Sequence, residues 1–381
     1  MQDNRLGTRA SLAVGHTAAM IDLVALPVWV GVLLGGYGFS PSTGGGLVTL
    51  FLCGAVVASF ATARFFRQLP VHRTTPLFYL SAALAFIAML SMDSIAVLTF
   101  LHFVAGLCVG AAGSSVHGTM GRMSNPHRVF ALGNLFLGCF AVAFLGTLPM
   151  LIAHYGRETL FVAFAVTFIA AALATLIRFP KLATIETKNH AEPIQPAVWF
   201  LVAGVMLMAL VQSMTFSFLE RVATERGFDE AQMRTIFLSL GIINIFPPIL
   251  AAMLQRRLNP TITGMVGAMF QAVFSFTIMN ASEWTLFAPP AIFFSFAMIF
   301  THTFLFGRIA ALEPSGRISA ATPAMLMTGS SIGPFLGGIL VETYSYGAIG
   351  KVAVVFGLMA AALFFLSARY SRKTPAELQP A

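Results

Sequence analysis

Asp22 is the acidic residue best placed to do chemistry in this chain, because it lies in the middle of an apolar stretch, residues 11–34. A helix that rises about 1.5 Å per residue crosses a hydrocarbon core of about 30 Å over this length and places Asp22 near its centre. An ionised carboxylate there is costly unless it is paired, hydrated or protonated. We therefore interpret Asp22 as a proton-coupling group; the alternative is a neutral aspartate that hydrogen-bonds between packed helices.

The composition is that of a membrane protein. Of 381 residues, 57% are hydrophobic and 9% are charged, against about 25% charged residues in soluble domains. The net charge of +8 does not indicate nucleic-acid binding, because Lys and Arg are scattered singly and in pairs between apolar runs. The three cysteines lie inside apolar runs, so we expect neither a disulfide framework nor a CxxC metal site, and no cofactor.

The elements that must position Asp22 are twelve apolar runs, which predict an all-α membrane protein. They lie near residues 11–34, 44–66, 74–92, 95–120, 129–152, 158–178, 197–219, 231–254, 261–280, 285–307, 317–341 and 346–368. A polar stretch with three prolines, residues 179–196, separates six runs from six. We predict a six-helix bundle over residues 1–178, a cytoplasmic linker over 179–196, and a second six-helix bundle with a short cytoplasmic tail over 197–381.

The distribution of positive charge predicts the orientation, because cytoplasmic loops retain Lys and Arg. With the N-terminus inside and twelve spans, 17 of the 22 Lys and Arg residues fall on the cytoplasmic side. Both termini are therefore expected in the cytoplasm. An odd number of spans would scramble this bias.

The two predicted halves resemble each other in sequence. The string SFATAR ends at Arg64 after span two, and AAMLQR ends at Arg256 after span eight. After spans four and ten, the strings NPHRVFA and EPSGRISA each place a Pro shortly before an Arg. Matches at equivalent positions of two six-span halves indicate an internal repeat with pseudo-symmetry.

Span eleven contains the string GSSIGPFLGG, in which Gly329, Gly333, Pro334 and Gly337 fit a GxxxGPxxGG pattern. With this motif and the repeat, the chain resembles the major facilitator superfamily of secondary transporters over essentially its whole length. In antiporters of that family the motif is usually found in span five, whereas here it occupies the pseudo-symmetric span eleven. Independently of the family, glycines four residues apart allow two helices to approach closely, and Pro334 bends its helix.

Two further strings extend the resemblance. The family's loop after span two carries an Asp–Arg gating pair; here Arg64 and Arg67 remain, Ala63 replaces the acid, and the second copy keeps Arg256. These arginines are candidate gate residues or ordinary positive-inside anchors. In span four, HFVAGLCVG resembles the family's RxxxGxxxG pattern with His102 in place of Arg. In several members of the family, that basic position works with an acid of span one in proton coupling, so the resemblance implies this role for His102.

The predicted geometry allows Asp22 and His102 to pair. In antiparallel spans their depths differ by about 5 Å, which helix tilt can absorb. A protonated His102 near Asp22 would favour the charged carboxylate, and separating the two would favour the protonated one. The alternative for His102 is a neutral imidazole bonded to a neighbouring helix.

Several residues are candidates for contact with a solute. Gln212, Asn244 and Gln271 each offer a donor and an acceptor inside a span, and Asn244 precedes Pro247-Pro248, which should break the helix. Trp29 lies two helical turns after Asp22 and fits either stacking on a solute or an interface belt. Phe216 is a candidate for lining an apolar cavity, and His302 for contacting an acidic solute.

The sequence thus predicts a monomeric carrier of a small organic solute, working by alternating access in a bacterial inner membrane. Proton-coupled export of an amphipathic or aromatic compound fits the Phe-rich, weakly charged interior. Uptake of a small organic acid and uniport remain open, as does a transporter-like sensor. An enzyme is not expected, because no HExxH metal motif occurs and the serines beside His117 have no nearby acid.

Overall fold

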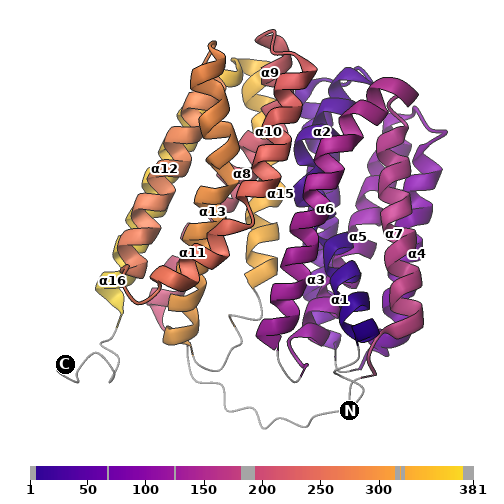
Figure 1. Ribbon diagram of the computed structural model, residues 1–381, viewed down its shortest axis with the longest axis horizontal. Coiled ribbons are helices and arrows are strands. Elements are labelled where there is room, and N and C mark those ends of the chain that lie inside the picture. The colour runs from indigo at the N-terminus through magenta and orange to yellow at the C-terminus, as the bar shows by residue number, and fades with distance from the viewer. Residues whose placement is uncertain are drawn as a thin grey trace.

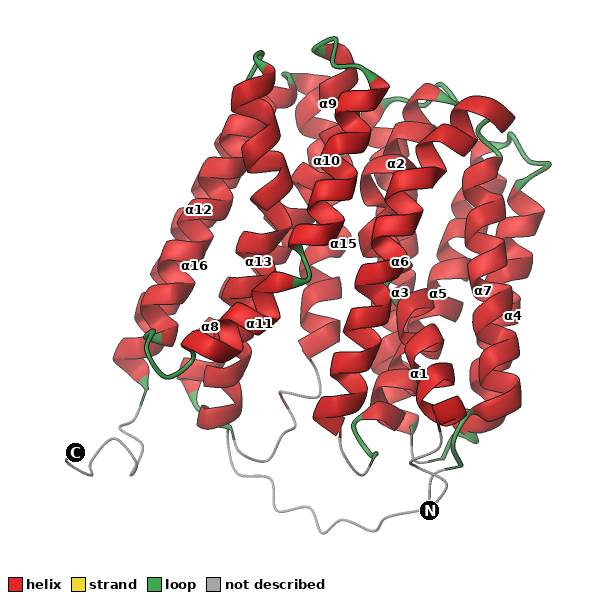
Figure 2. Cartoon of the chain, in the orientation of Figure 1, coloured by secondary structure: helices red, strands yellow, loops and turns green. Residues whose placement is uncertain are grey.

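The computed structural model describes residues 6–66, 68–123, 126–181, 194–313, 318 and 322–371, and the described elements are all helices (Figure 2). The first half contains α1 (Leu6–Ala19), α2 (Ile21–Gly35), α3 (Pro41–Phe65), α4 (Val71–Met89), α5 (Ile95–Met120), α6 (Pro126–Tyr155) and α7 (Thr159–Arg178). The second contains α8 (Pro196–Ser217), α9 (Leu219–Glu225), α10 (Glu230–Ile243), α11 (Phe246–Leu254), α12 (Pro260–Asn280), α13 (Trp284–Leu312), α15 (Thr322–Thr343) and α16 (Tyr346–Tyr370).

The predicted all-α membrane fold is confirmed, and each of the twelve predicted runs overlaps a helix or a broken pair of helices. Eleven described spans are long and apolar enough to cross a membrane. The twelfth, α4, begins with His72 and Arg73, which make its first turn polar. The predicted count of twelve is therefore matched approximately.

Three of the spans are broken helices. Met20 separates α1 from α2 with φ −112° and ψ 8°, and Phe218 separates α8 from α9 with nearly the same φ −109° and ψ 6°. Asn244 and Ile245 separate α10 from α11, just before Pro247. The last break is the one that the sequence predicts, because proline lacks the N–H that would continue the helix.

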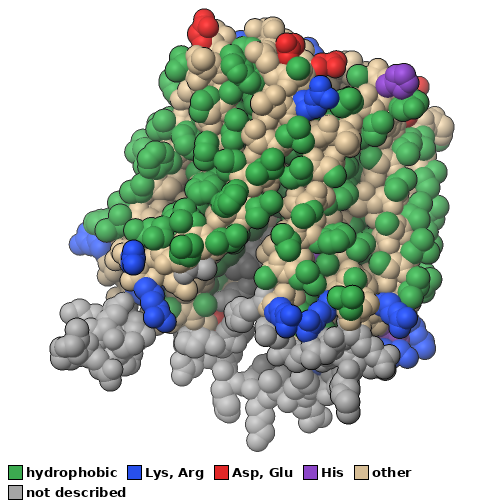
Figure 3. Space-filling model, viewed as in Figure 1, with side chains coloured by type: hydrophobic (Ala, Val, Ile, Leu, Met, Phe, Trp, Pro, Cys, Tyr) green, Lys and Arg blue, Asp and Glu red, His purple; other side chains and the backbone are tan. Residues whose placement is uncertain are grey.

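The helices form one long bundle in which the first half, indigo to magenta, lies beside the second, orange to yellow (Figure 1). We call the end where α1 begins and α16 ends the termini end, and the opposite end, which holds α9, the far end. Large apolar side chains cover the flank of the bundle, and most visible Lys and Arg side chains lie near the termini end (Figure 3). An apolar flank between two charged ends is the surface expected of a membrane protein.

The glycine-rich helix α15 packs against helices of both halves. A Cβ added to Gly333 would meet Ser213 and the backbone of α8. On another side of α15, a Cβ added to Gly45 of α3 would meet the carbonyl of Pro334. These close approaches need glycine, so the motif read from the sequence marks where α15 touches its neighbours.

Candidate functional site

Asp22 lies in the first turn of α2, two residues after the break at Met20. Its side chain is fully buried, and neither carboxylate oxygen has a hydrogen-bond partner. A buried carboxylate without partners is costly when ionised and much less so when it carries a proton. The arrangement at Asp22 is therefore that of a proton-binding group, and its role stays a prediction.

His102 is buried in an aromatic cluster. Its Nδ1 donates to the carbonyl of Leu98 at 2.8 Å, while its Nε2 has no partner. The ring stacks on Trp29 with 5.6 Å between centroids, and the rings of Phe86 and Phe161 meet it edge-on. The imidazole thus has one fixed N–H and one nitrogen free to accept a proton.

Trp29 occupies the centre of the same cluster. It is fully buried, and besides His102 it contacts Phe51 and Phe164 at centroid distances of 5.0 and 4.8 Å. It does not lie in an interface belt, because no part of it is exposed. A solute could stack on Trp29 only if this cluster rearranged.

Asp22 and His102 are not hydrogen-bonded to each other here, since both Asp22 oxygens and His102 Nε2 are unpartnered. His102 stacks on Trp29, which lies seven residues and about 10 Å beyond Asp22 along α2. Their predicted pairing would require a different conformation.

The second half holds a network of neutral polar side chains. Gln212 Nε2 of α8 donates to Ser295 Oγ of α13 at 2.8 Å, and its Oε1 accepts from Gln271 Nε2 of α12 at 3.0 Å. Gln271 also reaches the Met208 carbonyl at 3.2 Å. Beside it, the hydroxyls of Thr215 and Ser275 lie 2.6 Å apart. The structure thus brings together two predicted solute-binding residues, Gln212 and Gln271.

The other predicted solute residues lie apart from this network. Asn244 caps α10, and its Oδ1 is buried without a partner. His302 has an unpartnered Nδ1, and its ring lies 4.9 Å from that of Phe306. Phe216 is 4% exposed and packs in the core, so it lines no open surface in this conformation.

The predicted gate arginines lie at helix ends. Arg64 is exposed in the last turn of α3, Arg256 is exposed in the turn after α11, and Arg67 lies outside the described residues. Hydrogen bonds between the halves are found toward the far end. There Glu342 Oε2 accepts from the Ser42 amide at 3.2 Å, and Thr49 Oγ1 accepts from the Phe335 amide at 3.1 Å.

The structure also brings together His16, which is buried, and His117, which is partly buried; these two were not paired from the sequence. His16 Nδ1 of α1 lies 2.8 Å from His117 Nε2 of α5, and His16 Nε2 lies 3.1 Å from Asn134 Oδ1 of α6. Since Oδ1 only accepts, His16 donates to Asn134 and His117 donates to His16. The signal was present in the sequence, because His16 begins span one and His117 ends span four, at the same end of antiparallel spans.

Glu220 follows directly on span seven as predicted from the sequence, residues 197–219. The structure extends this span from Pro196 to Glu225, so that Glu220 lies inside it, and its Oε2 is buried without a partner. The apolar run ends at residue 219, but the chain turns at Phe218 and continues as α9. Only the packing of α9 reveals that Oε2 is buried, in a side chain that is partly buried as a whole.

The string Gly329 to Gly333 also fits the GxSxG pattern of a hydrolase nucleophile elbow. Such an elbow is a sharp turn between a strand and a helix. Here the string lies inside α15, and Ser331 Oγ donates to the Thr328 carbonyl at 2.8 Å. The serine is therefore part of a regular helix surface.

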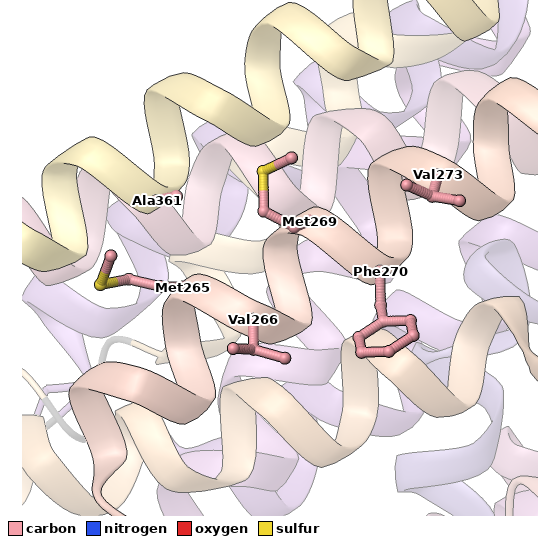
Figure 4. A pocket seen from close by; sticks show the side chains of 6 residues that line it. All are labelled: Met265, Val266, Met269, Phe270, Val273 and Ala361. Atoms are coloured by element: carbon pink, nitrogen blue, oxygen red, sulfur yellow. The ribbon is translucent and has the colours of Figure 1, made fainter.

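A shallow apolar groove lies on the flank between α12 and α16 (Figure 4). Its lining residues carry apolar side chains: Met265, Val266, Met269, Phe270, Val273 and Ala361. Phe270 and Val273 are 56% and 52% exposed on the face that lipid would cover. With no polar group to orient a solute, the groove is not a candidate solute site.

Comparison with known families settles the class of protein. The sequence profile described as the Major Facilitator Superfamily matches residues 12–322, which is most of the chain. The chain belongs to the Major Facilitator Superfamily. The family resemblance read from the glycine motif and the repeat is thereby confirmed, and members of this superfamily are membrane transporters.

Solved structures of superfamily transporters share the fold. A bacterial homolog of the human lysosomal transporter Spinster, in an inward-facing and unoccupied conformation, is 13% identical with a TM-score of 0.70, covering 97% of this chain and 98% of that one. The nucleoside transporter NupG is 12% identical with a TM-score of 0.71, covering 96% and 100%. A D-xylose-proton symporter is 14% identical with a TM-score of 0.69, covering 94% and 97%. No curated protein sequence matches this chain.

Proposed function

We propose that this superfamily member is a proton-coupled exporter of a small amphipathic or aromatic solute. The observation that carries the proposal is Asp22, a fully buried carboxylate with no hydrogen-bond partner in the middle of the first span. A coupled carrier needs a group whose protonation changes with the access state. Asp22 is protonated when sealed in the apolar bundle and ionised when water or a protonated His102 reaches it.

Alternating access supplies the change of environment. The residues 1–178 and 197–381 act as two bundles that rock against each other around a central site. The far-end contacts of α15 with α3 support a conformation closed at that end. Gly329, Gly333, Pro334 and Gly337 form the hinge surface of α15, and Arg64, Arg67 and Arg256 are the gate residues of the termini end.

The solute class follows from the neutral character of the second half. Gln212 and Gln271 orient polar groups of the solute by hydrogen bonds, with Asn244 and His302 offering unpartnered atoms. This chemistry suits an uncharged or weakly polar compound with an apolar body. Uptake of a small organic acid through His302, or uniport, is the alternative that the experiment below separates; a transporter-like sensor would move no solute.

We place the protein as a monomer in a bacterial inner membrane, with both termini in the cytoplasm. The charge distribution supports the orientation, because 17 of the 22 Lys and Arg residues fall on the termini side of the twelve predicted spans. Under this orientation the far end faces outward.

The test measures proton movement in proteoliposomes loaded with a pH-sensitive dye, with a panel of amphipathic cations, organic acids and sugars. We expect one solute class to move protons in the native protein, and Asp22→Asn to abolish proton movement while solute binding persists. Asp93→Asn is the matched control, because Asp93 is an exposed acid whose side chain is 80% accessible. Equal solute-driven proton movement by the native protein and Asp22→Asn would refute the role of Asp22.

A further inference from the structure

Glu220 is a second carboxylate held between the halves, close to the far end. It follows the break at Phe218, as Asp22 follows the break at Met20. Its side chain rests on the backbone of α2 at Gly31, where an added Cβ would lie 2.7 Å from Oε2. Gly31 is nine residues, or about 13 Å, beyond Asp22, so the two acids occupy different levels of α2.

The charged neighbours of Glu220 leave Oε2 without a partner. Arg221 pairs instead with Glu225, with 3.4 Å between Nε and Oε1, and Tyr346 donates to the same Glu225 oxygen at 3.0 Å. Arg221 still places a positive charge near Glu220, and Glu230 adds a negative charge with a smaller influence. In the helices packed against α9, namely α2, α8 and α12, Asp22 is the one ionisable side chain.

This environment ties the charge of Glu220 to contact between the halves. A carboxylate whose Oε2 is pressed on an apolar helix without a hydrogen-bond donor is costly when ionised, whereas a neutral carboxyl fits there. Separation of α9 from α2 would expose the Glu220 carboxyl to water, where the ionised form is favoured. A proton on Glu220 must then favour the closed far end, because the linkage between binding and conformation is reciprocal.

We propose that Glu220 is a proton-binding site that controls closure of the far end: the carboxyl is protonated while α9 rests on Gly31 and ionised when the halves part. The proton enters and leaves from the far side in both steps. It is therefore not carried across, and the site sets the rate of the transport cycle without changing the number of protons moved per solute. The inference needs only that the halves separate, so it does not depend on Asp22 being the coupling acid.

The experiment follows the far end directly and needs no solute. Spin labels on Ser91→Cys and Tyr344→Cys, both exposed far-end positions in opposite halves, report the opening in a full-length chain whose Cys53, Cys108 and Cys139 are replaced by alanine. The labelled protein is placed in lipid nanodiscs, and distance distributions are recorded between about pH 5 and about pH 9. One linked proton changes the ratio of closed to open molecules by at most about tenfold per pH unit.

We expect the native protein to open as the pH rises, and Glu220→Gln to stay closed throughout. Glu283→Gln is the matched control, because Glu283 is an exposed acid at the far end. This variant should open over the same pH range as the native protein. A Glu220→Gln protein that opens with pH as the native one does overturns the proposal. If Glu220 controls the opening, Asp22→Asn in the same labelled chain opens with pH as the native protein does. If only Asp22→Asn loses the pH dependence of opening, Asp22 controls it instead.

Gly31→Ala tests the same site from α2. The added Cβ displaces the Glu220 carboxyl from its contact with Gly31. The closed state with a protonated Glu220 is then less stable, and the midpoint of opening moves to lower pH. If a folded Gly31→Ala protein opens with the native pH midpoint, the contact between Glu220 and Gly31 does not control opening, whatever the result for Glu220→Gln.

Discussion

The region around α2 and the region between α8, α12 and α13 bury polar groups in different ways. Around α2, Asp22 and His102 are ionisable, and each keeps at least one side-chain atom without a hydrogen-bond partner; His102 lies among aromatic rings. Between α8, α12 and α13, the amides of Gln212 and Gln271 bond to each other and to Ser295, and the hydroxyls of Thr215 and Ser275 lie within hydrogen-bond distance. The first arrangement leaves ionisable groups without hydrogen-bond partners, and the second presents a defined pattern of donors and acceptors.

The difference suggests a division of work between two bundles of similar architecture. An unpartnered ionisable group gives each conformation a different proton affinity. A satisfied neutral network gives little response to pH, but it holds side chains in defined directions for a solute. Variants in the two regions should therefore separate stability, proton coupling and solute affinity.

The largest effect is expected from Trp29→Ala. Trp29 is fully buried among Phe51, His102 and Phe164, and removal of a large aromatic side chain from such a core costs about 3–5 kcal/mol. Thermal unfolding of the detergent-solubilised protein should occur at a clearly lower temperature. Trp199→Ala is the control, because Trp199 is 53% exposed on α8. Equal losses in both variants would show that the aromatic cluster adds no stability of its own.

Gln271→Leu should have an intermediate effect. It removes the donor to Gln212 Oε1 and to the Met208 carbonyl, and an acceptor left unpaired in a buried site costs about 1–3 kcal/mol. If the network orients the solute, the apparent KM rises while the number of protons moved per solute is unchanged.

The double variant Gln212→Leu with Gln271→Leu sharpens this test. The two residues bond directly, so their effects on stability and KM should be less than additive. Additive effects, or a changed proton count, would place the two glutamines in separate roles. Gln255→Leu, at an exposed position after α11, serves as the control.

Apolar length predicted the spans well, because crossing a membrane requires about 20 apolar residues. Pro247-Pro248 likewise predicted the break after Asn244. The break at Met20 has no such signal: α2 continues through Pro27 without ending, and the chain turns where neither Pro nor Gly stands. Without a Pro or Gly at the break, the residue types there do not predict it.

The candidate site was predicted in part for the same reason. The burial of Asp22 follows from its place in an apolar run, but the partners of a buried group depend on how each helix is rotated about its axis. Rotation brings Gln212 to Gln271 and His16 to His117, and it turns His102 toward Trp29. Glu220 was missed because an apolar run ends at residue 219, whereas the span continues through α9.

The smallest effect on stability is expected from His102→Phe. This variant tests most directly whether the region around α2 carries the proton coupling. Phenylalanine keeps the stacking on Trp29 and loses one hydrogen bond to the Leu98 carbonyl, worth about 1 kcal/mol, while also removing an unpartnered nitrogen. The unfolding temperature should therefore stay near the native value. If His102 works with Asp22, the number of protons moved per solute falls.

His302→Phe is the counterpart in the second half, where the ring already contacts Phe306. We expect His302→Phe to alter solute affinity. The number of protons moved per solute should stay the same, because His302 is not the predicted partner of Asp22. A loss of coupling in His302→Phe, with none in His102→Phe, would reverse the assignment of the two regions. It would place the proton chemistry on α13 and leave the aromatic cluster around Trp29 as a packing core.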